Sequence, residues 1–535
     1  MTEREENTVK KDQVCGKVWL AGAGPGDLGL LTLKTAALIG ESDVIVYDAL
    51  ISAEILSRIP EHTETVNVGK HSGNHPVPQH EINRILVEEA KKGKKVLRLK
   101  GGDPFIFGRG GEEIEALIRE NIPFEVVPGV TSAAAVPAYA GIPVTHRDFT
   151  SSFHVITGHA KKDGSLHIDF DSLVRLDGTL IFLMGVSSMP EILSGLLRAG
   201  MDPAMPAAVL EKGTLASQRR VRGTVSDLAE KAKEAGIGTP AIIVVGRVCA
   251  LEETMHWAED RILGGRQFIV TRPRKKSSAL AARLRRLGAQ VIELPAIRTE
   301  RITPNPKMEE ALDRFGKNVP QEWLVFTSPA GVEAFFEDLQ EQRRDLRALF
   351  AGEHLQPDRE AGHFVAKIGA IGSATAKELK KRGLIADLVP GTYSAAELGK
   401  ALAERAAENS RITILRAEQG SQELIPPLLR AGLEVQDIAL YRTVSEIHPF
   451  MREKIAHIMI KDGEIDAVTF TSGSTVRGFV QTFAGTEEPD FRQIDALCIG
   501  EQTAGEAEKY GMKIHTAEEA SMDAMVKMIT EIYGR

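Results

Sequence analysis

Apolar runs of strand length alternate with helical patterns along most of the chain. Residues 17–24 (KVWLAGAG) form an apolar run, and residues 28–40 carry apolar residues at helical spacing and end in a glycine suited to a C-cap. The next apolar run, residues 43–50, carries Asp48 near its carboxyl end. The same alternation continues to residues 241–246 (AIIVVG). This pattern predicts an α/β fold.

The alternation breaks in residues 245–265, a charged stretch that ends in two glycines and is expected to be a linker. The α/β region that follows contains a pseudo-repeat. Residues 323–336 (WLVFTSPAGVEAFF) resemble residues 467–480 (AVTFTSGSTVRGFV), and residues 370–384 resemble residues 498–512. Each of these segments has the pattern of a strand, a Ser/Thr/Gly turn and a helix. We therefore predict two similar lobes with a cleft between them.

Length and composition limit the classes of protein that fit. The 535 residues suffice for three or four structural units of about 150 residues each. The net charge of −8 argues against sequence-independent nucleic-acid binding. The three cysteines lie far apart, which predicts neither a zinc site nor disulfides. A polar start and the lack of an apolar run of about 18 residues predict no membrane association and a cytoplasmic protein.

Two glycine-rich stretches are candidates for ligand binding. Residues 22–27 (GAGPGD) are similar to the start of a dinucleotide-binding turn, for which Asp43 or Asp48 could supply the ribose acid. Asp27 replaces the third glycine, however, and its charge would repel a pyrophosphate, so a tight strand-to-helix turn is the alternative. Residues 98–113 (RLKGGDPFIFGRGGEE) hold five glycines, which suit a close approach of main chain to a ligand.

These stretches belong to a series of motifs that includes VIVYDALIS, VGKHSGNHPVPQHEIN, VVPGVTSAAAVPAYAGIPVTHRD, FLMGV and EKGTLASQRRVRGTV. In this order the motifs resemble those of the tetrapyrrole methylases, and most closely of uroporphyrinogen-III C-methyltransferase, over residues 15–258. The resemblance implies a two-lobed domain that binds S-adenosylmethionine. The residues that it implies for cofactor binding are Pro25, Gly101, Gly102, Asp103, Ile106, Thr131, Ser132, Met184 and Gly213.

The resemblance also implies how the methyl group is transferred. Asp48 matches the family's proposed base, and Lys70 its proposed proton donor or partner of a substrate carboxylate. A helix cap for Asp48 and a solvated charge for Lys70 are the alternatives. The substrate carries eight carboxylates, for which arginines are suited. Basic residues in or beside the glycine-rich motifs are candidates for this contact, namely Arg98, Lys100, Arg109 and Arg147.

Three histidines are spaced like metal ligands, namely His71, His75 and His80. Their loop matches a family segment that binds no metal, and we predict no metal site. The family usually has Arg directly after the Lys, whereas this chain has His71. The substrate contact expected of that Arg therefore has no assigned residue in this chain.

Residues 264–535 resemble uroporphyrinogen-III synthase. The resemblance lies in short motifs in order, among them VTRP, FTSPAGV, IGSATAKEL, LYRTV, FTSGSTV and IGEQTA. It implies a second two-lobed α/β domain that needs no cofactor. Such an enzyme removes a hydroxyl from hydroxymethylbilane, inverts the last pyrrole ring and closes the macrocycle.

Candidate residues of this second domain follow from the same motifs. Tyr441 matches the family's candidate general acid, with a half-buried aromatic residue as the alternative. Arg272 and Arg416 each follow a strand and could hold substrate carboxylates. Hydroxyls at helix starts could do the same, or could only cap their helices. These are Thr327, Ser328, Ser373, Thr375, Ser472, Ser474 and Thr503.

Together the two resemblances predict a bifunctional enzyme that makes uroporphyrinogen III and methylates it twice to precorrin-2, on the branch to sirohaem or cobalamin. The alternative is an active methyltransferase whose second half only binds a tetrapyrrole or a partner. A nicotinamide dehydrogenase is disfavoured because no GxGxxG sequence is present. The methyltransferase family also implies a homodimer, although the sequence shows no interface.

Overall fold

A computed structural model describes residues 15–69, 77–159, 166–272, 274–347, 365–446, 449–459, 463–485 and 489–535. The chain divides into two compact units. The first unit holds the described residues up to Ala296 and those from residue 449 on, and the second is Ile297–Glu446. Within the described ranges, no helix is long and apolar enough to cross a membrane.

The first sheet has the strand order β3-β2-β4-β1-β5, and all its strands are parallel. Its strands are β1 (Lys17–Gly22), β2 (Val44–Tyr47), β3 (Glu64–Asn67), β4 (Lys95–Lys100) and β5 (Phe124–Val127). The intervening helices are η1 (Leu28–Leu30), α1 (Leu33–Glu41), α2 (Ala53–Leu56), α3 (Gln79–Lys91) and α4 (Gly110–Arg119). This is the α/β alternation that the apolar pattern predicted.

One local prediction in this region is wrong. Gly40 does not cap the first helix but lies inside α1, which ends at Glu41 with Ser42 as its C-cap. The helix also begins late, because the Thr32 hydroxyl accepts a hydrogen bond from the Thr35 N–H and fixes the first turn there.

The second sheet has the order β6-β7-β10-β8-β9, with three antiparallel pairings. Its strands are β6 (Phe153–Thr157), β7 (Thr179–Leu183), β8 (Pro206–Glu211), β9 (Arg219–Thr224) and β10 (Ala241–Val245). The helices of this part are α5 (Ser132–Tyr139), α6 (Phe170–Arg175), α7 (Met189–Arg198), α8 (Leu228–Glu234), η2 (Arg247–Leu251) and α9 (Glu252–Met255). Val248 and Cys249 in η2 are buried, so the start of the expected linker is packed structure.

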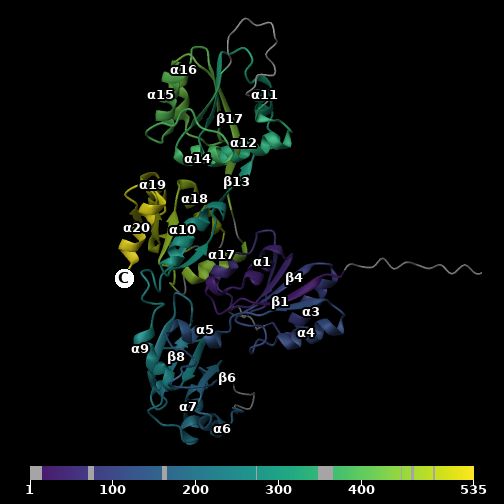
Figure 1. The fold of residues 1–535 in the computed structure, drawn as a ribbon, viewed down its shortest axis with the longest axis vertical. Helices are drawn as coiled ribbons and strands as arrows, with labels where there is room; N and C mark the ends of the chain where they lie inside the picture. Colours follow the sequence, from purple (N-terminus) through teal and green to yellow (C-terminus); the bar gives the residue numbers. More distant parts are fainter. Residues whose placement is uncertain are drawn as a thin grey trace, which may run out of the picture. The chain divides into compact units, whose positions relative to one another are not determined.

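The third sheet is also parallel, with the order β12-β11-β18-β19-β20. It combines two distant segments, which Figure 1 shows as teal and yellow ribbons side by side. We call this part, residues 267–296 and 449–535, lobe A. Its elements are β11 (Gln267–Val270), α10 (Arg274–Arg286), β12 (Gln290–Glu293), α17 (Pro449–His457), β18 (Ala467–Phe470), α18 (Gly473–Thr482), η5 (Phe491–Gln493), β19 (Asp495–Cys498), α19 (Glu501–Glu508), β20 (Lys513–Thr516) and α20 (Met522–Tyr533).

The second unit, Ile297–Glu446, is called lobe B. Its sheet has the order β13-β17-β16-β14-β15, and only the β13–β17 pair is antiparallel. Its elements are β13 (Ile297–Arg301), α11 (Pro306–Arg314), β14 (Gln321–Phe326), α12 (Pro329–Glu341), β15 (Val365–Ala370), α14 (Ser373–Lys381), α15 (Ala395–Arg405), β16 (Arg411–Ala417), η3 (Gln422–Leu424), α16 (Ile425–Arg430) and β17 (Glu434–Ser445).

The pseudo-repeat is confirmed as structure. β14 and α12 in lobe B correspond to β18 and α18 in lobe A, and β15 and α14 correspond to β19 and α19. In all four cases a parallel strand ends in a turn that opens a helix. Lobe A is split by the whole of lobe B in the sequence, an arrangement that the sequence did not predict.

Candidate active sites

Three loops meet at the carboxyl edge of the first sheet, where the main chains of Gly22, Gly102 and Gly129 touch. A Cβ on Gly22 would lie 2.5 Å from the Gly102 carbonyl oxygen, and one on Gly129 would lie 2.2 Å from it. The Gly24 N–H donates to the Gly102 carbonyl at 3.1 Å, and the Gly102 N–H to the Gly24 carbonyl at 2.8 Å. Glycines from three sequence motifs thus allow three backbone segments to touch. Gly102 has a φ of +67°, which favours glycine.

Two aspartates hold these loops in shape. Oδ1 of Asp103 accepts a hydrogen bond from the Phe105 N–H at 2.8 Å, and its Oδ2 accepts one from the Gly129 N–H at 3.0 Å. Oδ1 of Asp27 accepts from the Gly29 N–H at 2.6 Å, and its Oδ2 accepts from the Tyr139 hydroxyl at 2.7 Å. Asp27 is therefore a loop-shaping residue. The predicted contact of Asp103 with a cofactor stays a prediction.

Five of the other expected cofactor residues lie in or beside the loops of this junction. Pro25 lies in the first loop, Ile106 in the second, and Thr131 caps α5, of which Ser132 is the first residue. The second sheet supplies Gly213, where a Cβ would lie 2.2 Å from Cγ1 of Val136 on α5. Its β7 is followed by Met184, which is 52% exposed and has a φ of 56°.

The loops of the two sheets touch one another. The Asp27 N–H donates to the Thr214 hydroxyl at 3.3 Å, one residue after Gly213. At the opposite end of the junction a Cβ on Gly102 would have only the Ser132 nitrogen nearby, at 3.8 Å. A ligand can therefore approach the main chain of Gly102 there.

Asp48 follows β2 at the same carboxyl edge, and a buried charge cluster orients its carboxylate. Nη2 of Arg98 lies 2.6 Å from Oδ1 of Asp48, and Nε of Arg98 lies 3.1 Å from Oε1 of Glu113. Nζ of Lys100 lies 2.9 Å from the same glutamate oxygen. The side chain of Asp48 stays 28% exposed, whereas that of Arg98 is 2% exposed. Asp48 can therefore reach a ligand while Arg98 fixes its orientation.

The cluster overturns part of the expectation for substrate carboxylates. Arg98 and Lys100 are buried and paired inside the protein, so the expectation that they bind substrate is wrong. Burial and the neighbouring Arg98 lower the pKa of Lys100. Arg109 pairs with Glu112 at the surface, and Arg147 is exposed.

Lys70, His71 and His75 lie outside the described residues, and His80 lies in the first turn of α3. Among the described residues, no group of three His, Cys, Asp or Glu side chains could hold a metal ion.

Three exposed apolar residues that the motifs did not single out, Leu50, Phe105 and Phe107, lie near the expected cofactor residue Ile106. Leu50 is 63% exposed, and Phe105, Ile106 and Phe107 are 56%, 44% and 43% exposed. A Cβ on Gly101 would lie 3.1 Å from the Leu50 Cβ, which places Leu50 against the glycine loop. An exposed apolar group of this kind is typical of a binding surface. The FIFG sequence next to the GGDP glycines was the available signal.

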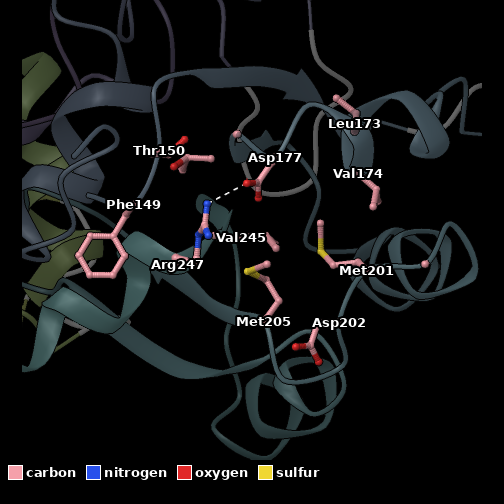
Figure 2. A pocket seen from close by; sticks show the side chains of 14 residues that line it. Phe149, Thr150, Leu173, Val174, Asp177, Met201, Asp202, Met205, Val245 and Arg247 are labelled. Carbon is pink, nitrogen blue, oxygen red and sulfur yellow. Dashed lines mark hydrogen bonds and ion pairs between the residues drawn. The ribbon is translucent and has the colours of Figure 1, made fainter. Parts of the chain in front are cut away.

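Two cavities of the first unit lie elsewhere. Figure 2 shows the side chains that line one of them, among which Arg247 pairs with Asp177 at 2.8 Å. This cavity measures about 150 Å³. It is smaller than an ordinary cofactor pocket of at least about 300 Å³. The other measures about 600 Å³ and is lined by residues that include Asp27, Glu54 and Arg285. Neither contains an expected cofactor residue.

In lobe B a hydroxyl pair forms at the carboxyl edge of the sheet. The Ser328 Oγ lies 2.8 Å from the Tyr441 hydroxyl, and it also accepts the Gly331 N–H as the N-cap of α12. Tyr441 is 8% exposed and packs in an apolar cluster with Phe326 and Leu440. Burial raises the pKa of Tyr441, so the phenol stays protonated at neutral pH.

The remaining candidates of lobe B lie at the same edge. Thr327 comes directly after β14, while Thr375 in the first turn of α14 is 1% exposed. Arg416 is 2% exposed, and its Nε and Nη2 lie 2.7 and 2.6 Å from the carboxylate oxygens of Asp437. This two-bond ion pair gives Arg416 a partner inside the lobe, and we leave it out of the proposed site.

Lobe A carries the other candidates. Arg272 follows β11, its Nη1 contacts the Met522 sulfur at 2.9 Å, and no carboxylate of the described residues pairs with it. Burial lowers the pKa of Arg272. Ser472 caps α18 and its Oγ lies 2.9 Å from that of Ser474, whereas Thr503 in α19 is 4% exposed. These four residues therefore follow three neighbouring strands, β11, β18 and β19. They lie in the turn after the strand or in the first turn of the next helix.

Comparisons with known proteins agree with this arrangement. Residues 17–229 match the tetrapyrrole (corrin/porphyrin) methylases, and residues 278–527 match uroporphyrinogen-III synthase HemD. The porphyrin biosynthesis protein HemD of Ruminiclostridium josui is 43% identical over 97% of this chain and 98% of its own length. The chain is a fusion that belongs to both families. It joins a methylase region to a synthase region made of lobes A and B.

Other similar proteins match shorter parts of the fusion. A uroporphyrinogen-III C-methyltransferase of Bacillus subtilis is 41% identical over 69% of this chain and 72% of its own length. Siroheme synthase 2 of Yersinia enterocolitica is 51% identical over 45% of this chain and 50% of its own length. A solved uroporphyrin-III C-methyltransferase of Thermus thermophilus, complexed with S-adenosylhomocysteine, is 40% identical over 44% of this chain and all of its own, with a TM-score of 0.39.

Proposed function

We propose that this fusion carries out two consecutive steps. The synthase region cyclises hydroxymethylbilane to uroporphyrinogen III with inversion of the last ring, and the methylase region methylates that product twice to precorrin-2. The observation that supports this best is the presence of both family matches in one chain, with a relative that covers 97% of it, because one family's product is the other's substrate.

The methylase region would hold S-adenosylmethionine at the loop junction, where that molecule supplies the methyl group. Pro25, Gly101, Gly102 and Met184 would shape this site, while Thr131 and Ser132 present the start of α5. Ile106 would contact S-adenosylmethionine, and the exposed Leu50, Phe105 and Phe107 beside it would lie against the macrocycle.

Asp48 would take the proton that leaves the macrocycle after methyl transfer. Arg98 keeps that carboxylate in one orientation, so its free oxygen can face the substrate. Lys70 would complete the site as proton donor or carboxylate partner. Removal of water and fixed geometry supply most of the acceleration, since the reduced pyrrole carbon is already electron-rich.

In the synthase region Tyr441 would donate the proton with which the bilane hydroxyl departs. Its raised pKa keeps the phenol protonated, and the Ser328 hydroxyl holds its direction. Arg272 has no carboxylate partner and would bind an acetate or propionate group of the substrate. Thr327 of lobe B and Ser474 of lobe A would each add a hydroxyl contact at the carboxyl edge of their own sheet, whereas Thr375 and Thr503 are buried and are left out. We propose no cofactor for this region.

Two separate assays test the two activities. The full chain with hydroxymethylbilane alone should give uroporphyrinogen III, whereas the type I isomer from spontaneous closure would support a synthase region that only binds. The full chain with supplied uroporphyrinogen III and S-adenosylmethionine should give a product with two added methyl groups. Light scattering during the second assay would test the homodimer that we propose for the methylase region.

A further inference from the structure

A short helix of the methylase region, α2, connects the proposed base to the cofactor loop. Its first residue, Ala53, is five residues after Asp48, and the Ile51 N–H donates to the Asp48 carbonyl at 3.2 Å. Its N-cap Ser52 donates its hydroxyl to the Gly26 carbonyl at 2.7 Å. All four residues of α2 are buried. A displacement of α2 would therefore move Asp48 and the GAGPGD loop together.

Glu54 on α2 forms an ion pair with lobe A. Its side chain is 3% exposed, and its Oε1 lies 2.5 Å from Nε of Arg285 on α10. Oε1 of Glu293 on β12 lies 3.0 Å from Nη1 of Arg285 and 3.2 Å from Nη1 of Arg58 of the methylase region. Burial raises the pKa of Glu54, while Arg285 opposes that rise. Without Arg285, the Glu54 carboxylate would be a buried charge without a cationic partner.

Apolar packing surrounds these charges. Ile51, Ile55 and Ile59 belong to the same buried cluster as Ile292 and Met451 of lobe A. α2 packs against β12 and α17. The apolar contacts pack α2 against lobe A. The ion pairs restrain the position of α2 along β12, since a shift that broke them would leave a buried charge without its partner.

From these contacts we propose that lobe A of the synthase is a structural part of the methyl-transfer site, with Arg285 as a positioning residue. Arg285 fixes the position of Glu54 and so of α2. The position of α2 in turn determines those of the Gly26 loop and Asp48. This inference rests on the proposed methyltransferase function. It means that the first reaction's domain supports the geometry of the second reaction's site.

The test uses the full chain and S-adenosylmethionine as the probe. Arg285→Met should weaken the equilibrium affinity for S-adenosylmethionine about tenfold and raise its KM equally, with a smaller fall in kcat on supplied uroporphyrinogen III. Glu54→Gln combined with Arg285→Met removes both charges and should restore the affinity to within about threefold. Because the second substitution also relieves the destabilisation by the unpaired Glu54 charge, the unfolding of each variant is measured alongside, and a lower affinity in folded Arg285→Met is the result that supports positioning.

Arg84→Met is the matched control. Arg84 pairs at the surface of α3 with Glu81 and Glu88, and its loss should leave the affinity unchanged. If Arg285→Met does not fold, Arg285→Lys and the double variant give the same comparison. Wild-type affinity in Arg285→Met overturns this inference alone. A wild-type chain that binds no S-adenosylmethionine overturns the proposed methyltransferase together with it.

Discussion

The two lobes of the synthase region place the same serine differently. Ser328 in lobe B and Ser472 in lobe A follow equivalent strands, cap equivalent helices and have nearly the same backbone angles, with φ of −163° and −168°. Ser328 bonds to Tyr441, which lies 113 residues away in the sequence. Ser472 instead bonds to Ser474 and takes part in a capping box with Thr475.

The neighbouring residues explain this difference. In α18 the positions two and three residues after the cap are Ser474 and Thr475. The Ser474 hydroxyl lies 2.9 Å from the Ser472 Oγ, and the Thr475 hydroxyl accepts a hydrogen bond from the Ser472 N–H at 3.3 Å. In α12 the same positions are Ala330 and Gly331, which have no hydroxyl, so Ser328 turns to Tyr441. A duplicated motif can therefore serve only capping in one lobe and also bond to a tyrosine hydroxyl in the other.

The largest effect should come from Tyr441, because it is the proposed acid. Tyr441→Phe keeps the ring in its apolar cluster and removes only the proton donor. The rate of uroporphyrinogen III formation should fall about 100-fold, with type I isomer accumulating, since general acids contribute at least that much. Methylation of supplied uroporphyrinogen III should stay unchanged in the same preparation, and an unchanged synthase rate would remove Tyr441 from the mechanism.

Ser328→Ala should have the next largest effect, because that hydroxyl has two functions. Loss of the cap should lower the free energy of unfolding of lobe B by about 1 kcal/mol. Loss of the bond to Tyr441 should slow ring closure about fivefold, as expected for a neutral hydrogen bond. Denaturant unfolding and the bilane assay measure the two effects, and a loss of stability with a normal rate would reduce Ser328 to a cap.

Ser472→Ala tests the equivalent serine of lobe A. The same loss of about 1 kcal/mol is expected for the cap of α18, again by denaturant unfolding. The synthase rate and the KM for hydroxymethylbilane should change less than about twofold, because Ser472 bonds within its own turn. A rise in KM of tenfold or more would instead show that Ser472 binds substrate as well.

The smallest effect concerns a buried acid of α12 that has no acidic counterpart at the equivalent position of α18. Asp338 on α12 is 5% exposed, and the equivalent position of α18 is the buried Thr482. Burial, with Glu341 and Glu337 nearby, raises the pKa of Asp338 from 3.8 to about 6 despite Arg301. The folded state therefore favours the protonated acid, and its ionisation costs stability as the pH rises from about 4 to 6.

Asp338→Asn removes that cost. The variant should melt about 2 °C higher than the wild type at pH 7.5, and at the same temperature below pH 4. Scanning calorimetry at the two pH values measures the difference. A variant that melts lower at pH 7.5 would show that the ion pair with Arg301 outweighs the burial of the carboxylate.

The sequence predicted those features of the fold and the site that short motifs determine. The glycine motifs located the loop junction, VIVYDAL placed Asp48 at a strand end, and the repeated TS turns located both carboxyl edges. These features depend on residues that are close in the chain.

Partners far apart in the sequence could not be predicted. Arg98 and Arg416 were expected to bind substrate carboxylates. In the structure Arg98 pairs with Asp48 and Glu113, and Arg416 pairs with Asp437. The split of lobe A into two segments was missed because a strand's sequence does not show which strand lies beside it. Asp27 was noticed only for the pyrophosphate it would repel, and its bond to Tyr139 required the fold.

One incubation tests the central claim, that a single chain forms and then methylates uroporphyrinogen III. The purified full chain receives hydroxymethylbilane and methyl-deuterated S-adenosylmethionine, and the product is analysed by mass and by isomer type. We predict a type III product that carries two labelled methyl groups. A type I macrocycle, or a type III macrocycle without label, would contradict the account.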